Sequence, residues 1–290
     1  MKYGIVYAYW SKDWEGEYIK TIERAANCGF DVLEIFTPLL LTLPQKKLEE
    51  VKAAAEERKI ELSFLIGLGK DHDISSEDDG VRRAGVEYLK QILEKVHFLG
   101  GKNFSGINYC AWADFSEYER KAEKTKSSIK SLKELGKVAE EYGISYNLEI
   151  TNRFENFLLN TSAEAVDLVK EVNSPNVNIL LDTFHMNIEE ASMYDAIIGA
   201  GEKLGHFHAG ENNRVVPYGG TMMAWDQVAK GLKEIGYQKT ITLEPLVRTG
   251  GTVSRDSNIW RDMTNQADDK RMDEMAKEGL YRETVISGGI

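Results

Sequence analysis

Four short apolar runs decide the fold of this chain: YNLE (residues 146–149), NILLD (178–182), GHFH (205–208) and ITLE (241–244). Each run reads as a buried strand, and each ends in a residue that binds hard metal ions, namely Glu149, Asp182, His208 and Glu244. The runs are spaced by about one strand plus one helix, so we expect the four residues at the C-terminal tips of successive barrel strands. Because these tips meet on one face of a barrel, the pattern predicts a metal site there.

The same alternation of strands and helices extends through the whole chain. Earlier strand-like runs cover Tyr3 to Tyr9, Asp31 to Phe36, Glu61 to Ile66 and Asn103 to Ile107. Helical patterns cover Tyr18 to Cys28, Leu43 to Arg58, Gly80 to Leu99, Phe115 to Tyr142, Ser162 to Val172, Ser192 to Leu204, Trp225 to Ile235 and Asp268 to Ile286. Three helix–glycine–strand junctions resemble one another: AANCGFDVLEI, AEEYGISYNLEI and LKEIGYQKTITLE. Strict alternation predicts a parallel sheet, and eight units predict a (β/α)8 TIM barrel of the α/β class.

Two long irregular stretches, 212–224 and 245–267, follow the seventh and eighth predicted strands. In a barrel, loops at those positions belong to the catalytic face. A doubly wound open sheet has the same alternation and is the structural alternative, but no GxGxxG or Walker-type loop follows the first strand. The chain has 290 residues, 42% of them apolar, and a barrel typically needs ~250 residues. We therefore expect residues 1–290 to form a single domain.

Composition restricts the cellular setting and the class of ligand. The N-terminal segment has too short an apolar run for a signal peptide, and no uncharged apolar stretch is long enough for a membrane span. Cys28 and Cys110 lack CxxC spacing, so neither a disulfide framework nor a thiolate zinc site is indicated. A formal net charge of -11 without a basic stripe disfavours nucleic acids and anionic membranes. We expect a soluble cytoplasmic protein that acts on a small molecule.

The residues at the strand tips are informative as a set. Taken singly, an acid at a strand end often caps a helix, and a histidine in a strand is often a packed core residue. Together, three carboxylates on adjacent tips, beside one imidazole, would repel one another without a cation. This oxygen-rich set suits Mn²⁺, Mg²⁺ or Co²⁺ better than zinc. His206 alternates with His208 and is expected to be packed or to lie behind the metal site.

Polar residues recur shortly after the strand tips. Glu155 follows Glu149 by six residues, His185 follows Asp182 by three, and Arg214 follows His208 by six. Such groups around a metal are typical of a sugar-binding site, although Glu155 and Arg214 could also be solvated surface charges. Two tryptophans, Trp14 and Trp112, follow strands and could form an apolar wall for a carbon chain, although core packing is the commoner role of tryptophan.

Four separated motifs carry a family resemblance: LEITNRFEN, NILLDTFHMNIEE, LGHFHAGENNRVVP and LEPLVRTGGT. In order and spacing they resemble the D-tagatose/D-psicose (allulose) 3-epimerase family, which belongs to the xylose-isomerase-like (β/α)8 barrels. The resemblance extends from GIVYAYW near the N-terminus to NIWRD near residue 260.

The resemblance implies an isomerase of the carbohydrate 3-epimerase type with one divalent ion, Mn²⁺ or Co²⁺, with Mg²⁺ as a further candidate. It places the metal ligands on Glu149, Asp182, His208 and Glu244, and the acid/base pair on Glu149 and Glu244. It places contacts to the O1 to O3 end of the sugar on Glu155, His185 and Arg214. It also implies a homodimer or homotetramer.

The chain departs from the family pattern outside these groups. Ala209 replaces a threonine, Leu246 replaces a phenylalanine, and Val6 stands where relatives usually carry an aromatic residue. The segments SGINYCAW (105–112) and YGGTMMAW (218–225) also differ from the family. These changes leave the metal and proton-transfer groups untouched, and they leave the preferred ketose open.

The implied reaction interconverts D-fructose with D-psicose, D-tagatose with D-sorbose, or both, through a cis-enediolate formed by removal of the C3 proton. An aldose–ketose isomerase or another sugar epimerase, such as an L-ribulose 3-epimerase, is the alternative on the same barrel. A phosphosugar enzyme is a further alternative, because Arg248–Gly251 lies where barrels often bind phosphate. A non-catalytic sugar-binding barrel would have no reason to keep two glutamates on the metal.

Overall fold

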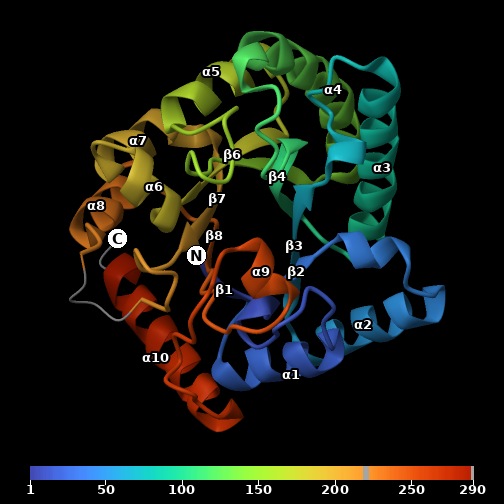
Figure 1. The fold of residues 1–290 in the computed structure, drawn as a ribbon. Coiled ribbons are helices and arrows are strands. Elements are labelled where there is room, and N and C mark those ends of the chain that lie inside the picture. The colour runs from blue at the N-terminus through green and yellow to red at the C-terminus, as the bar shows by residue number, and fades with distance from the viewer. Residues whose placement is uncertain (218–221, 289–290) are drawn as a thin grey trace.

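The computed structural model describes residues 1–217 and 222–288, and in them eight parallel strands form a closed barrel in which β8 returns to pair with β1 (Figure 1). The strands are β1 (Lys2–Val6), β2 (Val32–Phe36), β3 (Glu61–Leu68), β4 (Asn103–Ala111), β5 (Ser145–Glu149), β6 (Val177–Asp182), β7 (Leu204–Ala209) and β8 (Thr240–Leu243). The predicted TIM barrel is confirmed, and the doubly wound open sheet is excluded by the closure.

Helices follow the strands along the chain, and most of them surround the barrel on its outside (Figure 1). They are α1 (Tyr18–Cys28), α2 (Gln45–Arg58), α3 (Asp79–Phe98), α4 (Lys121–Tyr142), α5 (Ser162–Val172), α6 (Thr183–Glu189), α7 (Met193–Ala200), α8 (Trp225–Glu234), α9 (Thr252–Asp256) and α10 (Asp269–Gly288). In the described residues, no helix combines the length and the apolar character needed to cross a membrane.

Two of the predicted helix–glycine–strand junctions show why the glycine is needed. Gly29 after α1 has φ +92°, and Gly143 after α4 has φ +63°. Both are left-handed conformations that end a helix without the steric penalty of a Cβ atom. In each case the backbone N–H of the glycine donates to carbonyls of the last helical turn, and the chain then enters the next strand.

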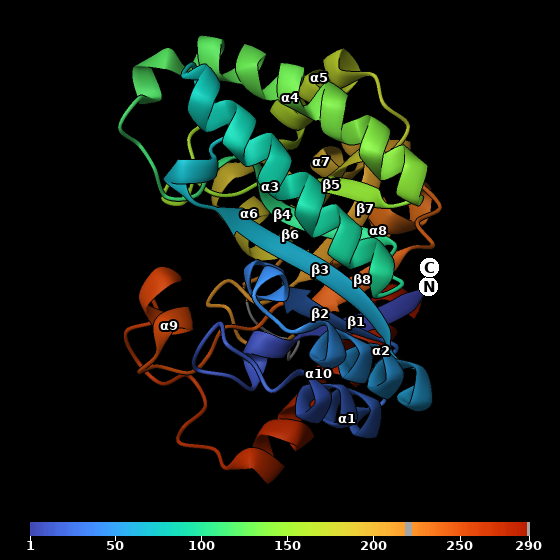
Figure 2. The ribbon, with the colours of Figure 1, turned by 90° about the vertical axis from the view of Figure 1, so that its right-hand side faces the viewer.

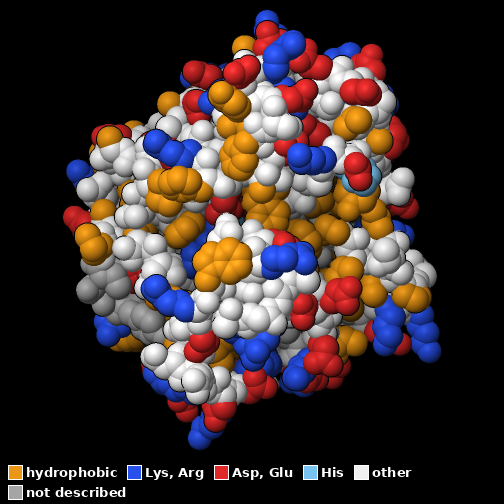
Figure 3. Space-filling view, viewed as in Figure 1, with side chains coloured by type: hydrophobic (Ala, Val, Ile, Leu, Met, Phe, Trp, Pro, Cys, Tyr) orange, Lys and Arg blue, Asp and Glu red, His pale blue; other side chains and the backbone are white. Residues whose placement is uncertain are grey.

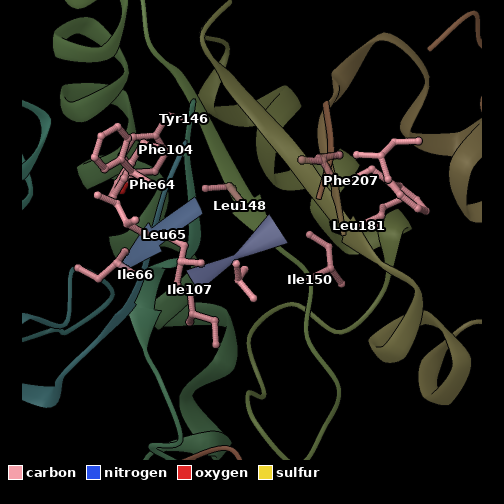
Figure 4. Packing of buried hydrophobic residues seen from close by; sticks show 14 of the residues in the cluster. Phe64, Leu65, Ile66, Phe104, Ile107, Tyr146, Leu148, Ile150, Leu181 and Phe207 are labelled. Atoms are coloured by element: carbon pink, nitrogen blue, oxygen red, sulfur yellow. The ribbon is translucent and has the colours of Figure 1, made fainter. Parts of the chain in front are cut away.

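Parallel strands covered on both faces give the barrel its core, which explains the nearly continuous apolar runs in the sequence. Phe64, Phe104 and Tyr146 lie together in this core (Figure 4) and are fully buried. The rings of Phe104 and Tyr146 meet edge to face, with centroids 5.2 Å apart. Large side chains therefore fill the layers between the strands and the helices.

Two predicted boundaries were wrong. The first strand ends at Val6, and Tyr7–Tyr9 forms a 3-10 helix instead of continuing it. The helix predicted from Phe115 begins only at Lys121, after the 3-10 turn Tyr118–Arg120.

Two short helices were not predicted from the sequence. Helix α6 follows β6 at once, because the Asp182 carboxylate accepts a hydrogen bond from the Phe184 backbone N–H and caps it. Helix α9 lies within the predicted loop 245–267. A side view shows α9 at one end of the barrel and the N-terminus at the opposite end (Figure 2).

Candidate metal centre

The four residues predicted at the strand tips lie together at one end of the barrel. Glu149 and Asp182 are the last residues of β5 and β6, His208 is in β7, and Glu244 directly follows β8. One ligand atom from each side chain lies within 4.8 Å of those of the other three. Asp182 and His208 are almost fully buried, and Glu149 and Glu244 are slightly open to a pocket.

Strand register explains why these residues meet. Asp182 of β6 pairs directly with His208 of β7, and His208 pairs with Thr242 two residues before Glu244. On the other side, Glu149 of β5 pairs with Leu180, also two residues before Asp182. Because side chains alternate along a strand, these offsets keep all four groups on the inward side near the mouth.

The donor set fits a divalent cation. Asp182 Oδ2 and His208 Nδ1 are buried and have no hydrogen-bond partner among the described residues. A buried polar atom without a partner costs about 1–3 kcal/mol, so these atoms need a ligand that the described protein groups do not supply. Three carboxylates with one imidazole match the hard, oxygen-rich ligation of Mn²⁺, Mg²⁺ or Co²⁺.

The electrostatics of the protein groups also indicate a site built for positive charge. Burial raises the pKa of Asp182 to about 7, and the charge of Glu244 adds to this effect. Burial also acts to raise the pKa of Glu244, but the nearby His208 and Arg214 outweigh it and hold that pKa below its usual range. A cation among these carboxylates would favour their ionised forms.

The structure brings Glu155, His185 and Arg214 to the same place. One Arg214 nitrogen, Nη2, lies 2.8 Å from Glu155 Oε1, and the other, Nη1, lies 3.1 Å from Glu244 Oε2. His185 Nε2 lies 3.6 Å from Glu149 Oε1, while its Nδ1 accepts a hydrogen bond from the Asn152 backbone. The charge of Arg214, with that of His185, holds the pKa of Glu155 below its usual range despite the opposing effect of burial.

Arg214 itself is buried and stacks its guanidinium 4.0 Å from the centre of the Phe184 ring. Burial tends to lower its pKa, but the surrounding carboxylates raise it further, so Arg214 stays charged. The alternative interpretation of Arg214 as a solvated surface cation is therefore wrong. A fixed guanidinium beside the acidic cluster can orient an electronegative substrate.

A pocket opens beside these polar groups, with Glu149 and Glu244 on its lining. Its apolar side is formed by Trp14, Phe36, Leu65, Ile107, Trp112 and Leu246. Trp14 stacks on Phe36 with ring centroids 4.7 Å apart and meets Trp112 edge to face at 6.3 Å. In the space-filling view, hydrophobic side chains gather toward the middle of this face (Figure 3).

Sequence reasoning missed Glu34, which is fully buried in β2. Its Oε1 lies 2.7 Å from His208 Nε2, and its Oε2 lies 3.0 Å from Nε2 of His206, which is packed as expected. Burial acts to raise the pKa of Glu34, but the two histidines outweigh it and lower that pKa. The signal in the sequence was an acid inside the apolar run VLEIF. A carboxylate buried in a barrel strand is costly unless a partner binds it, so such an acid indicates a buried partner.

Among the departures from the family pattern, Val6 and Ala209 are buried, and Leu246 lines the pocket. The segment Tyr218–Trp225 lies in part outside the described residues, which omit positions 218–221.

The stretch proposed for phosphate binding is already engaged. The backbone N–H groups of Gly250 and Gly251 both donate to the Ser254 hydroxyl, and Arg248 donates to the Trp10 carbonyl. These contacts disfavour a phosphosugar substrate at this position.

Comparison with known proteins gives a consistent result. The family model described as a xylose isomerase-like TIM barrel matches residues 22–265. A D-psicose 3-epimerase of Ruminiclostridium cellulolyticum is 41% identical over 281 residues, covering 97% of this chain and 96% of the relative. A D-psicose 3-epimerase of Agrobacterium fabrum is 39% identical over 290 residues, covering all of both chains. The crystal structure of a D-psicose 3-epimerase with D-tagatose, from Clostridium cellulolyticum H10, has a TM-score of 0.96 at 40% identity and covers 99% of each chain.

Proposed function

Because this chain belongs to the D-psicose 3-epimerases of the xylose isomerase-like TIM barrel family, we propose that it is a metal-dependent ketose 3-epimerase. Its substrates are free ketoses, D-fructose and D-psicose, D-tagatose and D-sorbose, or both pairs. The observation that carries the proposal is the convergence of two glutamates, Glu149 and Glu244, on one small pocket beside a buried arginine. Inversion at a carbon next to a carbonyl needs two such proton-transfer groups.

Glu149, Asp182, His208 and Glu244 would hold one divalent ion, Mn²⁺ or Co²⁺, with Mg²⁺ as a further candidate. When bound, the ion supplies a Lewis acid that polarises the C2 carbonyl and favours the negative charge left by removal of the C3 proton.

Two carboxylates transfer the proton in this scheme. One of Glu149 and Glu244 removes the proton from C3, and the other returns a proton to the opposite face of the planar carbon. Both side chains line the pocket, and they come from β5 and from the residue after β8. Arg214, hydrogen-bonded to Glu244, favours its ionised form and so keeps it able to accept a proton.

The remaining residues orient the sugar. Glu155, His185 and Arg214 bind the polar O1 to O3 end, while Trp14 and Trp112 form the wall for the rest of the carbon chain. Support comes from their shared pocket and from the contacts that fix Arg214 between Glu155 and Glu244. We further propose that the protein is a cytoplasmic homodimer or homotetramer. Size-exclusion chromatography with light scattering measures the mass of the assembly and so tests the oligomeric state.

The test is proton NMR of the Mn²⁺-treated protein in D2O with D-fructose, D-psicose, D-tagatose and L-ribulose. We expect loss of the H3 signal, with the epimer appearing. Exchange at C1 alone would reveal an aldose–ketose isomerase, and L-ribulose as the preferred sugar would change the substrate assignment. Absence of exchange with every sugar would reject the proposal.

The two-base scheme has its own variants in the same assay. Glu149→Gln and Glu244→Gln should each lower C3 exchange by about 10²- to 10⁴-fold while keeping the wild-type circular dichroism. Glu61→Gln is the matched control, because Glu61 begins β3 at the opposite end of the barrel, where its carboxylate is exposed. Exchange at the wild-type rate in either site variant would reject the scheme.

A further inference from the structure

Glu34 has no role in the scheme above, yet it is a fully buried carboxylate in contact with a proposed metal ligand. We propose that Glu34 is a positioning residue that fixes the imidazole of His208, so that Nδ1 is the atom presented to the metal. This inference rests on the proposed function, because it concerns the same metal centre.

The contacts of Glu34 account for both of its oxygen atoms. Oε1 lies 2.7 Å from His208 Nε2. Oε2 accepts a hydrogen bond from the Ser63 hydroxyl and lies 3.0 Å from His206 Nε2. Since the carboxylate is held on both sides, it cannot rotate away from His208 without losing these contacts.

The hydrogen bond determines which nitrogen of His208 is free. An ionised carboxylate only accepts hydrogen bonds, so Nε2 of His208 must carry the proton that it shares with Glu34. An imidazole that binds a metal is neutral and has one N–H, so with that proton on Nε2 the lone pair offered to the metal would be on Nδ1. That atom lies 3.5 Å from Glu244 Oε1 and 3.9 Å from Glu149 Oε1, and has no hydrogen-bond partner among the described residues.

Neighbouring residues of the barrel also hold Glu34 in place. In the β2–β3 register Glu34 pairs directly with Ser63, whose hydroxyl also accepts a hydrogen bond from the Asn103 amide at 2.6 Å. The ring of His206 meets that of His208 edge to face with centroids 5.0 Å apart, which limits rotation of both rings. Carboxylates that accept from metal-binding histidines typically strengthen metal affinity by about 10- to 100-fold.

Two alternative roles of Glu34 make different predictions. A purely structural ion pair would stabilise the barrel without affecting metal binding. A second cation held by Glu34, His206 and His208, which also have ligand atoms close together, would give two bound ions per chain. Metal affinity, binding stoichiometry and the optical spectrum of bound Co²⁺ separate these alternatives from a positioning role.

The experiment measures Co²⁺ binding by calorimetry and visible absorption for the wild type, Glu34→Gln and a control. We expect one Co²⁺ per wild-type chain, and in Glu34→Gln an affinity about 10- to 100-fold lower with shifted absorption bands. The chelator-treated variant should keep the wild-type circular dichroism. The control is Glu283→Gln, which changes an equally buried carboxyl on α10 and should bind Co²⁺ as the wild type does.

Wild-type affinity and spectrum in a folded Glu34→Gln protein would overturn the inference while leaving the proposed metal centre intact, and so would two ions per wild-type chain. Failure of the wild type to bind Co²⁺ would instead remove the metal centre and the role of Glu34 with it. If Glu34→Gln does not fold, nitrogen NMR of the histidine rings in the Zn²⁺-loaded wild type decides the question. We expect a proton on Nε2 of His208, and a proton on Nδ1 would overturn the inference.

Discussion

At the scale of single residues, Arg214 links the proposed sugar-binding and proton-transfer groups. Its guanidinium reaches Glu155 and Glu244 with separate nitrogens and rests on the face of Phe184. A lysine would supply the charge without the planar fork that spans two carboxylates. The geometry of the site therefore depends on the shape of this side chain as well as on its charge.

Gly67 packs closely against the Trp112 ring. A Cβ atom at residue 67 would lie 2.5 Å from Trp112 Cε3, so Gly67→Ala must displace the indole. Because Trp112 lines the pocket, we expect KM for the preferred ketose to rise by about tenfold, equivalent to roughly 1.4 kcal/mol, with a smaller change in kcat. Steady-state kinetics measure both constants. Gly69→Ala is the control, because a Cβ there meets nothing within 4 Å, and an unchanged KM in Gly67→Ala would argue against Trp112 as part of the sugar pocket.

Glu283 provides a pH-dependent prediction that is independent of the metal centre. Burial, with a smaller effect from Glu211, raises its pKa to about 8, above the value near 4.3 of an unfolded chain. The folded state thus binds this proton more tightly, so its contribution to stability is present at low pH and is lost as the pH rises to about 8. Glu283→Gln replaces the titrating carboxyl with a neutral amide, so the variant should not lose this stability as the pH rises. We expect the variant to gain stability over the wild type by an amount on the order of 1–4 kcal/mol between pH 5 and pH 8.

Urea unfolding in the presence of a chelator, at several pH values between 5 and 8, measures this difference. A difference between Glu283→Gln and the wild type that stays constant with pH would contradict the raised pKa.

At the scale of elements, the short helix α9 holds the loop after β1 over the pocket. Thr252 and Asp256 of α9 accept hydrogen bonds from the backbone N–H and the indole Nε1 of Trp14, at 3.0 and 2.9 Å. The Val253 backbone N–H donates to the Lys12 carbonyl. Segments near opposite ends of the chain thereby position the stacked Trp14 and Phe36 rings.

The role of this contact is testable with Asp256→Ala. Loss of the carboxylate releases the Trp14 indole, so we expect KM to rise several-fold while kcat and the thermal midpoint change little. Asp256→Asn keeps an acceptor oxygen and should behave nearly as the wild type. Equal kinetics for the alanine variant and the wild type would mean that α9 does not control the pocket wall.

Helix α6 shows how one residue serves both an element and the site. Asp182 Oδ1 caps α6 by accepting from the Phe184 N–H, while Oδ2 lies close to the ligand atoms of Glu149, His208 and Glu244 that are proposed to bind the metal. The structural interpretation of an acid at a strand end therefore holds here, and it is compatible with the proposed role of Asp182 as a metal ligand. Capping also places His185, in the first turn of α6, beside Glu149.

At the scale of the whole molecule, the proposed ligands come from four consecutive strand ends, β5 to β8. A cation bound by all four would cross-link this half of the barrel and stabilise the folded state by mass action, by about 2.7 kcal/mol at a free metal concentration of 100 times Kd. We expect EDTA to lower the thermal midpoint by several degrees and added Mn²⁺ to restore it.

Differential scanning calorimetry of the wild type and Asp182→Asn measures this effect. Asp182→Asn removes one ligand and should show a much smaller response to Mn²⁺. An equal response in the two proteins would place the stabilising ion elsewhere.

The sequence by itself determined the alternation of strands and helices, the number of βα units, and the residues at the tips of the last four strands. Helix and strand periodicity and the helix-ending glycines are properties of neighbouring residues, so they can be read locally. Because the tips of parallel strands share one face, the convergence of Glu149, Asp182, His208 and Glu244 also followed from local pattern together with fold class.

Only the tertiary structure decided three contacts. These are the contact of Glu34 with His208, the hydrogen bond from the Trp14 indole to Asp256 of α9, and the burial of Arg214 between two carboxylates. Each joins segments that are far apart in sequence, and strand spacing does not specify which of them meet. For Glu34 and His208, barrel closure and strand register set the distance, because a shift of one residue in register would turn either side chain to the other face of the sheet. For Trp14 and Arg214, the paths of the loops after the strands set it.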